Sequence, residues 1–188
     1  MTETKLVVIS GGPGAGKTAL IEELRRRGYS CSSEVAREII QEQVRASGDA
    51  LPWAERESYA RQMLDRSVAA FEESSRAGSP VFFDRGIPDT LCYARLVGLS
   101  RELEHDAAVM CDRYRYWRRV FLAPPWREIY ETDSERRQNF DEAVRTYSLM
   151  QETYEGCGYE VVRLPLVSVE ERAAFLLDEI GEADITPR

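Results

Sequence analysis

The sequence predicts a three-layer α/β/α protein built on a five-stranded parallel sheet. Short apolar runs alternate with helical patterns along the chain, and a glycine-rich turn joins the first apolar run to the first helix. This alternation is typical of a parallel sheet with helices on both faces, because each parallel connection needs a crossover element. The 188 residues contain no internal repeat and no clear boundary, so we expect a single domain over residues 1–188.

Each expected strand is a short β-compatible run that ends at a turn residue. The first runs into the glycine-rich turn, the third runs into Asp84, the fourth breaks at Pro124 and the fifth closes at Pro165. The expected strands are 6–9, 29–33, 81–83, 116–122 and 159–164.

Each expected helix is an amphipathic segment bounded by capping or breaking residues. Gly28 ends the first helix, and Ser100 caps the fifth. The expected helices are 17–27, 34–47, about 54–76, 88–97, 100–111, 140–156 and 169–180. Apolar side chains that we expect to face the core include Ile39, Val44, Tyr59, Met63, Leu91 and Leu96, and we expect the same of the aromatic Trp53.

The composition excludes several classes of function. A net charge of −8 and a pI of 4.9 argue against nonspecific binding to nucleic acid or to anionic membranes. Four widely spaced cysteines and one histidine favour neither a zinc site nor a disulfide framework. The sequence has no signal-peptide pattern at its start and no apolar run near 18 residues. We therefore expect a cytoplasmic protein without a membrane span.

The glycine-rich turn carries the most specific motif in the chain. Gly11, Gly16, Lys17 and Thr18 fit G-x-x-x-x-G-K-[ST], in the strand–loop–helix context that this phosphate-binding loop (P-loop) requires. Glycines leave room for backbone N–H groups to surround a phosphate, and the helix that follows adds its N-terminal dipole. We expect Lys17 to reach the phosphates and Thr18 to bind Mg²⁺. The predicted nucleotide-binding residues are Gly11, Gly12, Pro13, Gly14, Ala15, Gly16, Lys17, Thr18 and Ala19.

A carboxylate and an arginine follow the third expected strand. Because ligands of parallel α/β sheets bind beyond the carboxyl ends of the strands, Asp84 is placed to hold Mg²⁺ or to act as a base. Arg85 is placed to contact a transferring phosphate or a substrate. The alternative is that Asp84 is a turn residue that caps the helix after Pro88.

A second pair of charged residues follows the second expected strand. Glu34 is placed to take the proton from an acceptor hydroxyl, and Arg37, one helical turn later, is placed to hold an anionic part of a substrate. The alternative is a solvated first helical turn in which the acidic charge favours the helix N-terminus.

A charged segment at about 127–139 follows the fourth expected strand and predicts a lid. Arginines on such a lid close over a nucleotide and neutralise transition-state charge, and Arg136 and Arg137 are the candidates. The alternative is a solvated helix start.

The order of these motifs resembles that of P-loop nucleoside and nucleotide kinases. In detail, residues 10–18, 34–38 and 83–89 resemble a family of small bacterial predicted ATPases of the AAA-domain type, related to the kinase domain that phosphorylates nicotinamide riboside. The resemblance covers roughly residues 5–180. It implies ATP and Mg²⁺ as cofactors, with Asp84 and Arg85 as the acid–arginine pair of the third strand.

The resemblance also implies that Glu34 is the residue that activates the acceptor hydroxyl. Deoxynucleoside kinases have a proline after this acid, whereas this chain has Val35, so the base is either Glu34 or Asp84. The sequence predicts a kinase that passes the γ-phosphate of ATP to a hydroxyl or phosphate of a nucleoside, nucleotide or related metabolite. The alternative is an NTP hydrolase or switch that acts on a protein partner; a GTPase is disfavoured because the chain lacks N-K-x-D.

Overall fold

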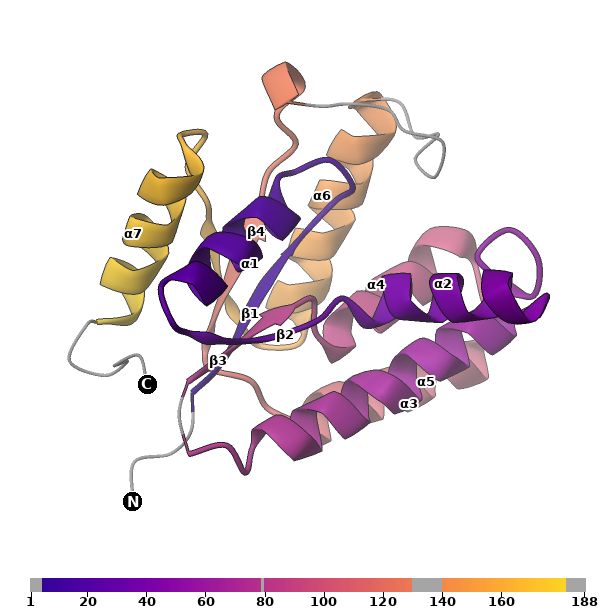
Figure 1. Cartoon of the computed structure of the whole chain (residues 1–188). Coiled ribbons are helices and arrows are strands. Elements are labelled where there is room, and N and C mark those ends of the chain that lie inside the picture. Colours follow the sequence, from indigo (N-terminus) through magenta and orange to yellow (C-terminus); the bar gives the residue numbers. More distant parts are fainter. Residues whose placement is uncertain (1–4, 79, 130–139, 182–188) are drawn as a thin grey trace.

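The structure, a computed structural model, describes residues 5–78, 80–129 and 140–181 (Figure 1). Its strands are β1 (Leu6–Gly11), β2 (Ser30–Ser32), β3 (Val81–Asp84), β4 (Arg119–Ala123) and β5 (Glu160–Arg163). Its helices are α1 (Lys17–Arg26), α2 (Val35–Ala46), α3 (Arg56–Ser74), α4 (Ile87–Val97), α5 (Arg101–Arg113), α6 (Phe140–Gly156) and α7 (Val169–Ile180), with a short 3₁₀ helix, η1 (Arg127–Ile129). Every expected strand and helix is confirmed.

The five strands form one parallel sheet in the order β2-β3-β1-β4-β5. From β1 the chain passes to the edge strand β2, returns to β3 beside β1, and then crosses to β4 and β5 on the other side of β1, so the strand order reverses at β1. In open α/β sheets, a ligand crevice forms beyond the carboxyl end of the strand where this reversal occurs. In this chain that end of β1 leads directly into the predicted P-loop.

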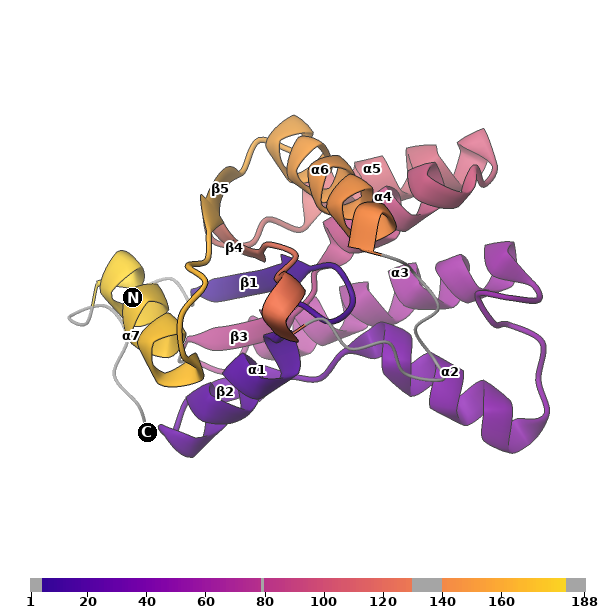
Figure 2. The ribbon, with the colours of Figure 1, turned by 90° about the horizontal axis from the view of Figure 1, so that it is seen from above.

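Alternate side chains of β1 enter two different hydrophobic clusters. Val7 and Ile9 pack with apolar residues of α1 and α7, whereas Leu6 and Val8 pack with residues of α3, α4, α5 and α6. Figure 2 shows α1 and α7 along one face of the sheet and α6 beyond the other. The predicted three layers are thus confirmed, with the parallel strands buried between them.

The helices that extend past the sheet carry fewer buried residues than predicted. Ile39, Tyr59 and Met63 form a small buried cluster between α2 and α3, as expected. Val44, however, is 58% exposed, Leu96 is 40% exposed and Trp53 is 61% exposed. Those three assignments to the core are wrong. Val44 and Trp53 lie near the end of α2 and in the turn after it, which extend away from the sheet (Figure 2), and Leu96 lies on the wall of a cavity.

The fourth strand begins later than predicted. It starts at Arg119 rather than at 116, because Tyr116 belongs to the bend that follows α5. The buried ring of Tyr116 packs edge-on against Phe71 and Phe83, and its hydroxyl accepts a hydrogen bond from Ile87 N–H. Tyr116, which the sequence pattern assigned to a strand, thus anchors the start of α4. No helix in the described ranges has both the length and the apolar character that a membrane crossing demands.

Candidate functional site

The predicted P-loop is a tight connection between β1 and α1 whose glycines are required by geometry. Gly11 has a φ of +144°, and a Cβ there would lie 2.5 Å from the Ala123 carbonyl oxygen on β4. Gly16 has a φ of +78° and forms the N-cap of α1. Since Gly16 has no side chain, the N-terminus of α1 opens directly onto the loop. The arrangement is that of an anion-binding helix N-terminus.

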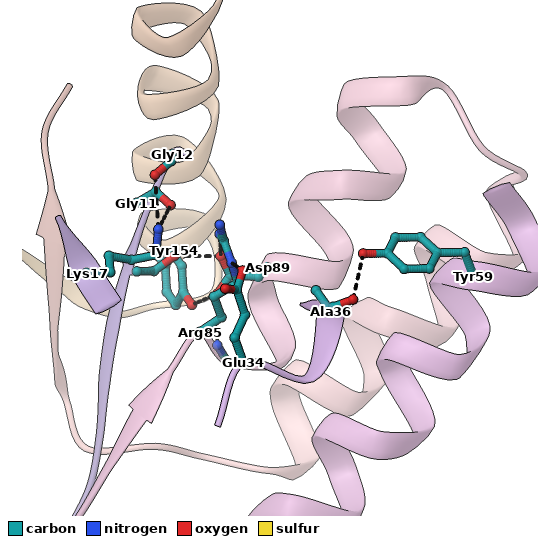
Figure 3. A network of polar contacts seen from close by, with 11 residues as sticks. Gly11, Gly12, Lys17, Glu34, Ala36, Tyr59, Arg85, Asp89 and Tyr154 are labelled. Carbon is teal, nitrogen blue, oxygen red and sulfur yellow. Dashed lines mark hydrogen bonds and ion pairs between the residues drawn. The ribbon is translucent and has the colours of Figure 1, made fainter. Parts of the chain in front are cut away.

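Lys17 lies across this loop. Its Nζ donates hydrogen bonds to the carbonyl oxygens of Gly11 at 2.8 Å and Gly12 at 3.0 Å (Figure 3). The residue is only 7% exposed. Burial, reinforced by the charge of Arg85, lowers the pKa of Lys17 from 10.5 to about 8, although nearby carboxylates oppose this shift. The loop therefore holds a buried cation beside its backbone N–H groups.

Asp84 stands next to the loop because β3 is the neighbour of β1. Asp84 pairs in register with Ile9, two residues before Gly11. Its carboxylate is buried, and Oδ1 has no hydrogen-bond partner in the described part of the chain. Burial raises the pKa of Asp84, and the Lys17 charge counteracts this effect. Asp84 lines a small pocket with Arg85 and Asp89, whereas Thr18 lines the larger cavity at the loop, and the charge of Lys17, the neighbour of Thr18, acts on the Asp84 carboxylate. A buried, unpartnered carboxylate oxygen and a threonine hydroxyl are the types of oxygen ligand that suit a hydrated Mg²⁺.

Arg85 connects the predicted Glu34 with a second carboxylate, that of Asp89. Its φ of +75° lies in the left-handed region, which arginine rarely adopts. Its guanidinium forms ion pairs with Glu34 at 2.8 Å and with Asp89 at 3.2 Å (Figure 3). The two carboxylates raise the pKa of Arg85 despite its burial. Arg85 is thus fixed at the edge of the loop as a permanent cation.

Glu34 is the N-cap residue of α2 and faces Arg85. Burial alone would raise its pKa, but the charges of Arg85 and Lys17 outweigh burial and lower the pKa of Glu34 to about 2. The carboxylate is therefore ionised at neutral pH. Arg37, in the first turn of the same helix, is exposed and lies on the wall of the adjoining pocket.

Asp89 is a central residue of the site, although the sequence pattern gave no role to it beyond its place at the start of the helix expected over 88–97. Its buried carboxylate accepts hydrogen bonds from Gly86 N–H, from the Ser10 hydroxyl, from the Tyr154 hydroxyl and from Arg85. Asp89 therefore performs the capping of α4 that was considered for Asp84. An acidic residue three positions after a glycine N-cap was the available signal. The contribution of Tyr154, from α6, had no local signal.

A cavity of about 940 Å³ opens from the P-loop. Its far walls come from α2, α3, α4 and α6, which bring positions distant in the sequence to one chamber. Lining residues that sequence reasoning missed include Arg56, Tyr93, Thr146 and Met150. Several predicted residues share the same cavity: Pro13, Gly14, Ala15, Gly16, Lys17, Thr18, Ala19, Glu34, Arg37 and Arg85.

The predicted lid is described only at its start. Residues 127–129 form η1, and the Arg127 guanidinium lies 4.1 Å from the centre of the Phe140 ring. The rest of the lid, with Arg136 and Arg137, lies outside the described residues.

Comparisons with known proteins agree with this geometry. A family model described as an AAA domain matches residues 6–172. No relative was found among curated protein sequences. Among solved structures, the NadR protein in complex with NR is similar with a TM-score of 0.69 and 21% identity, over 96% of this chain and 51% of that one. The chain thus spans about half the length of NadR.

Two smaller kinases match over nearly their whole length. Thymidylate kinase from Candida albicans is similar with a TM-score of 0.66 and 12% identity, over 96% of this chain and 92% of that one. Deoxyadenosine kinase from M. mycoides has a TM-score of 0.63 and 12% identity, over 94% of this chain and 98% of that one. At these identities the likeness concerns the fold. The chain belongs to the AAA-domain family that its sequence matches, and it has the P-loop fold of nucleoside and nucleotide kinases.

Proposed function

We propose that the protein is an ATP- and Mg²⁺-dependent kinase for a small molecule. One observation carries the proposal: the cavity of about 940 Å³ continues from the P-loop onto four further helices. Hydrolysis of a nucleotide needs room for the nucleotide and one water, whereas transfer needs a second chamber beside the terminal phosphate. Cavities of this size accommodate a small organic ligand. The chamber next to the phosphate site therefore favours a kinase over an NTP hydrolase.

The nucleotide half of the site would use the loop and the two carboxyl-edge residues beside it. Backbone N–H groups of the loop and the Lys17 ammonium would bind the phosphates. Thr18 and Asp84 would hold Mg²⁺, which supplies charge neutralisation between the β- and γ-phosphates when bound. Asp84 would act through water in the metal shell, since it is the buried last residue of β3.

The acceptor half of the site would use Glu34, Arg85 and Arg37. The Glu34 carboxylate, which is ionised and held by Arg85, would accept a hydrogen bond from an acceptor hydroxyl. Asp84 is the alternative base. Arg85 would stabilise charge on the transferred phosphoryl group, and Arg37 would hold an anionic part of the acceptor. Arg136 and Arg137 of the lid would complete the charge neutralisation.

The ligands of relatives with the same fold support one class of acceptor. NadR was solved with NR and also with NAD and AMP-PNP. Deoxyadenosine kinase from M. mycoides was solved with dATP. These ligands support a nucleoside, a nucleotide or a related metabolite as the acceptor in this chain.

The proposal is tested by ADP release from Mg·ATP in the presence of nucleosides, nucleotides, sugars and aminoglycoside-like alcohols. Strong stimulation by one class, with a phosphorylated product by mass spectrometry, is the expected result. The Asp84→Asn variant should lose this activity by orders of magnitude, whereas Arg101→Ala on the exposed start of α5 should retain it. Steady hydrolysis that no acceptor stimulates would contradict the proposal and favour an NTP switch.

A further inference from the structure

The largest fully buried side chain in the described part of the protein is that of Arg172 in α7, which does not line the cavity. Arg172 is only 2% exposed. No carboxylate in the described ranges pairs with it, and its Nη2 lacks a hydrogen-bond partner there. Burying an arginine without a counter-charge is costly, because the guanidinium stays protonated in proteins. Such a residue calls for an explanation.

The contacts of Arg172 join three loops at the carboxyl edge of the sheet. Nη1 donates to the Ala15 carbonyl oxygen at 2.9 Å, and Nε donates to the Pro165 carbonyl oxygen at 2.8 Å. The guanidinium carbon lies 4.9 Å from the centre of the Trp126 ring. Ala15 belongs to the P-loop, Trp126 follows β4 and Pro165 follows β5. One side chain thus bridges the P-loop to the segments after β4 and β5.

The bond to Ala15 has a definite consequence for the P-loop. The Ala15 carbonyl belongs to the same peptide unit as the Gly16 N–H, and in a trans peptide these two groups point in opposite directions. Fixing the carbonyl toward α7 therefore fixes the Gly16 N–H on the other side of the peptide, away from α7. Gly16 has no Cβ and a φ of +78°, so this peptide has little intrinsic preference that would hold it in place.

We propose that Arg172 is a positioning residue for phosphate binding, which orients the Ala15–Gly16 peptide so that its N–H donates to a bound polyphosphate. The buried charge of Arg172 also adds to the positive electrostatic potential at the P-loop, from the side of α7. This inference rests on the proposed phosphate site but not on the identity of the acceptor. The competing explanation is that Arg172 only fastens α7 to the rest of the domain.

The test measures binding of inorganic tripolyphosphate by calorimetry to the full chain and to its Arg172→Met and Arg172→Lys variants. Both variants should bind at least about tenfold more weakly, since neither can form the two-pronged contact that arginine makes. The matched control is Ile180→Ala, which opens the buried end of α7 about 12 Å away along the helix. This control should lower the melting temperature while leaving the affinity unchanged.

A second readout follows the peptide itself. The chain contains only two Ala-Gly pairs, 15–16 and 77–78, so labelling alanine carbonyls with ¹³C and glycine nitrogens with ¹⁵N selects two amide signals. In the wild type, tripolyphosphate should shift the Gly16 amide and leave the Gly78 amide unchanged. In both Arg172 variants the Gly16 shift should shrink.

The outcomes separate the two proposals. If the wild type does not bind tripolyphosphate, the phosphate site itself is wrong. If the wild type binds and the Arg172→Lys variant matches it in affinity and in the Gly16 shift, the positioning role is overturned. The same holds if Ile180→Ala weakens binding as much as Arg172→Met does, because general loosening of α7 would then explain the loss. If Arg172→Met does not fold, the comparison of Arg172→Lys with the wild type decides the outcome.

Discussion

The Lys17 ammonium loses its positive charge within a pH range in which binding can be measured. Its pKa in the free protein is lowered to about 8, chiefly by burial. Phosphate attracts only the protonated form. The affinity for ATP should therefore be constant below pH 8 and should weaken above it by up to about tenfold per pH unit, until the higher pKa of the bound state is reached.

Isothermal titration of ATP from pH 7 to pH 10 measures this dependence. Lys17→Arg is the matched control, because a guanidinium keeps its charge throughout this range. Its ATP affinity should not vary with pH, whatever its absolute value. If the ATP affinities of the wild type and of Lys17→Arg fall in parallel as the pH rises, a group other than Lys17 titrates and the prediction is wrong.

Glu34 separates the transfer step from nucleotide binding. The Glu34→Gln variant keeps the shape of the side chain but removes the carboxylate that would receive the acceptor proton. The rate of transfer to the acceptor should fall about a hundredfold or more, whereas the dissociation constant for ATP should change little. The two quantities are measured by product formation at saturating substrates and by equilibrium binding. A loss of ATP affinity with an unchanged transfer rate would assign Glu34 to holding Arg85 instead.

At the scale of one element, the start of α4 depends on the Asp89 carboxylate. Asp89→Asn would remove a buried charge that faces Arg85. It would also place an amide NH₂ group, which donates hydrogen bonds, among three groups that already donate to this position: the Ser10 hydroxyl, the Tyr154 hydroxyl and the Arg85 guanidinium. The free energy of unfolding should fall by about 3 kcal/mol or more. Tyr154→Phe removes one donor to the same carboxylate and should cost about 1 kcal/mol. Urea unfolding measures the free energy of unfolding of both variants. Equal decreases in the two variants would mean that the charge of Asp89 does not organise the network.

The elements were predictable because their signals are local. A run of apolar residues ended by Asp84, or a helix ended by Gly28, can be recognised within a few positions of the sequence. Burial was less predictable, because Val44 and Leu96 follow a helical pattern and yet are exposed, Leu96 on the wall of the cavity. Periodicity identifies the apolar face of a helix, but only the tertiary structure determines whether another element packs on that face.

At the scale of the whole molecule, the residues of the proposed phosphate half of the site could be named from the sequence, and those of the proposed acceptor half could not. The P-loop is one continuous segment, Asp84 ends β3 and Glu34 follows β2, and the carboxyl ends of these parallel strands lie at one edge of the sheet. The chamber beside them is assembled from α2, α3, α4 and α6, so Arg56, Tyr93 and Met150 converge only in three dimensions. Arg172 had no signal for the same reason, since its partner Ala15 is 157 residues away in the chain.

The central claim is that the chamber beside the P-loop receives a phosphate acceptor. Its most direct test is a single-turnover measurement: protein loaded with Mg·ATP is mixed with buffer or with the most stimulating acceptor, and ADP formation is followed. We predict that ADP forms slowly with buffer alone and at least a hundredfold faster with the acceptor, and that Lys17→Ala abolishes both rates while the protein stays folded. ADP formation at the same rate with and without every acceptor tested would contradict the account.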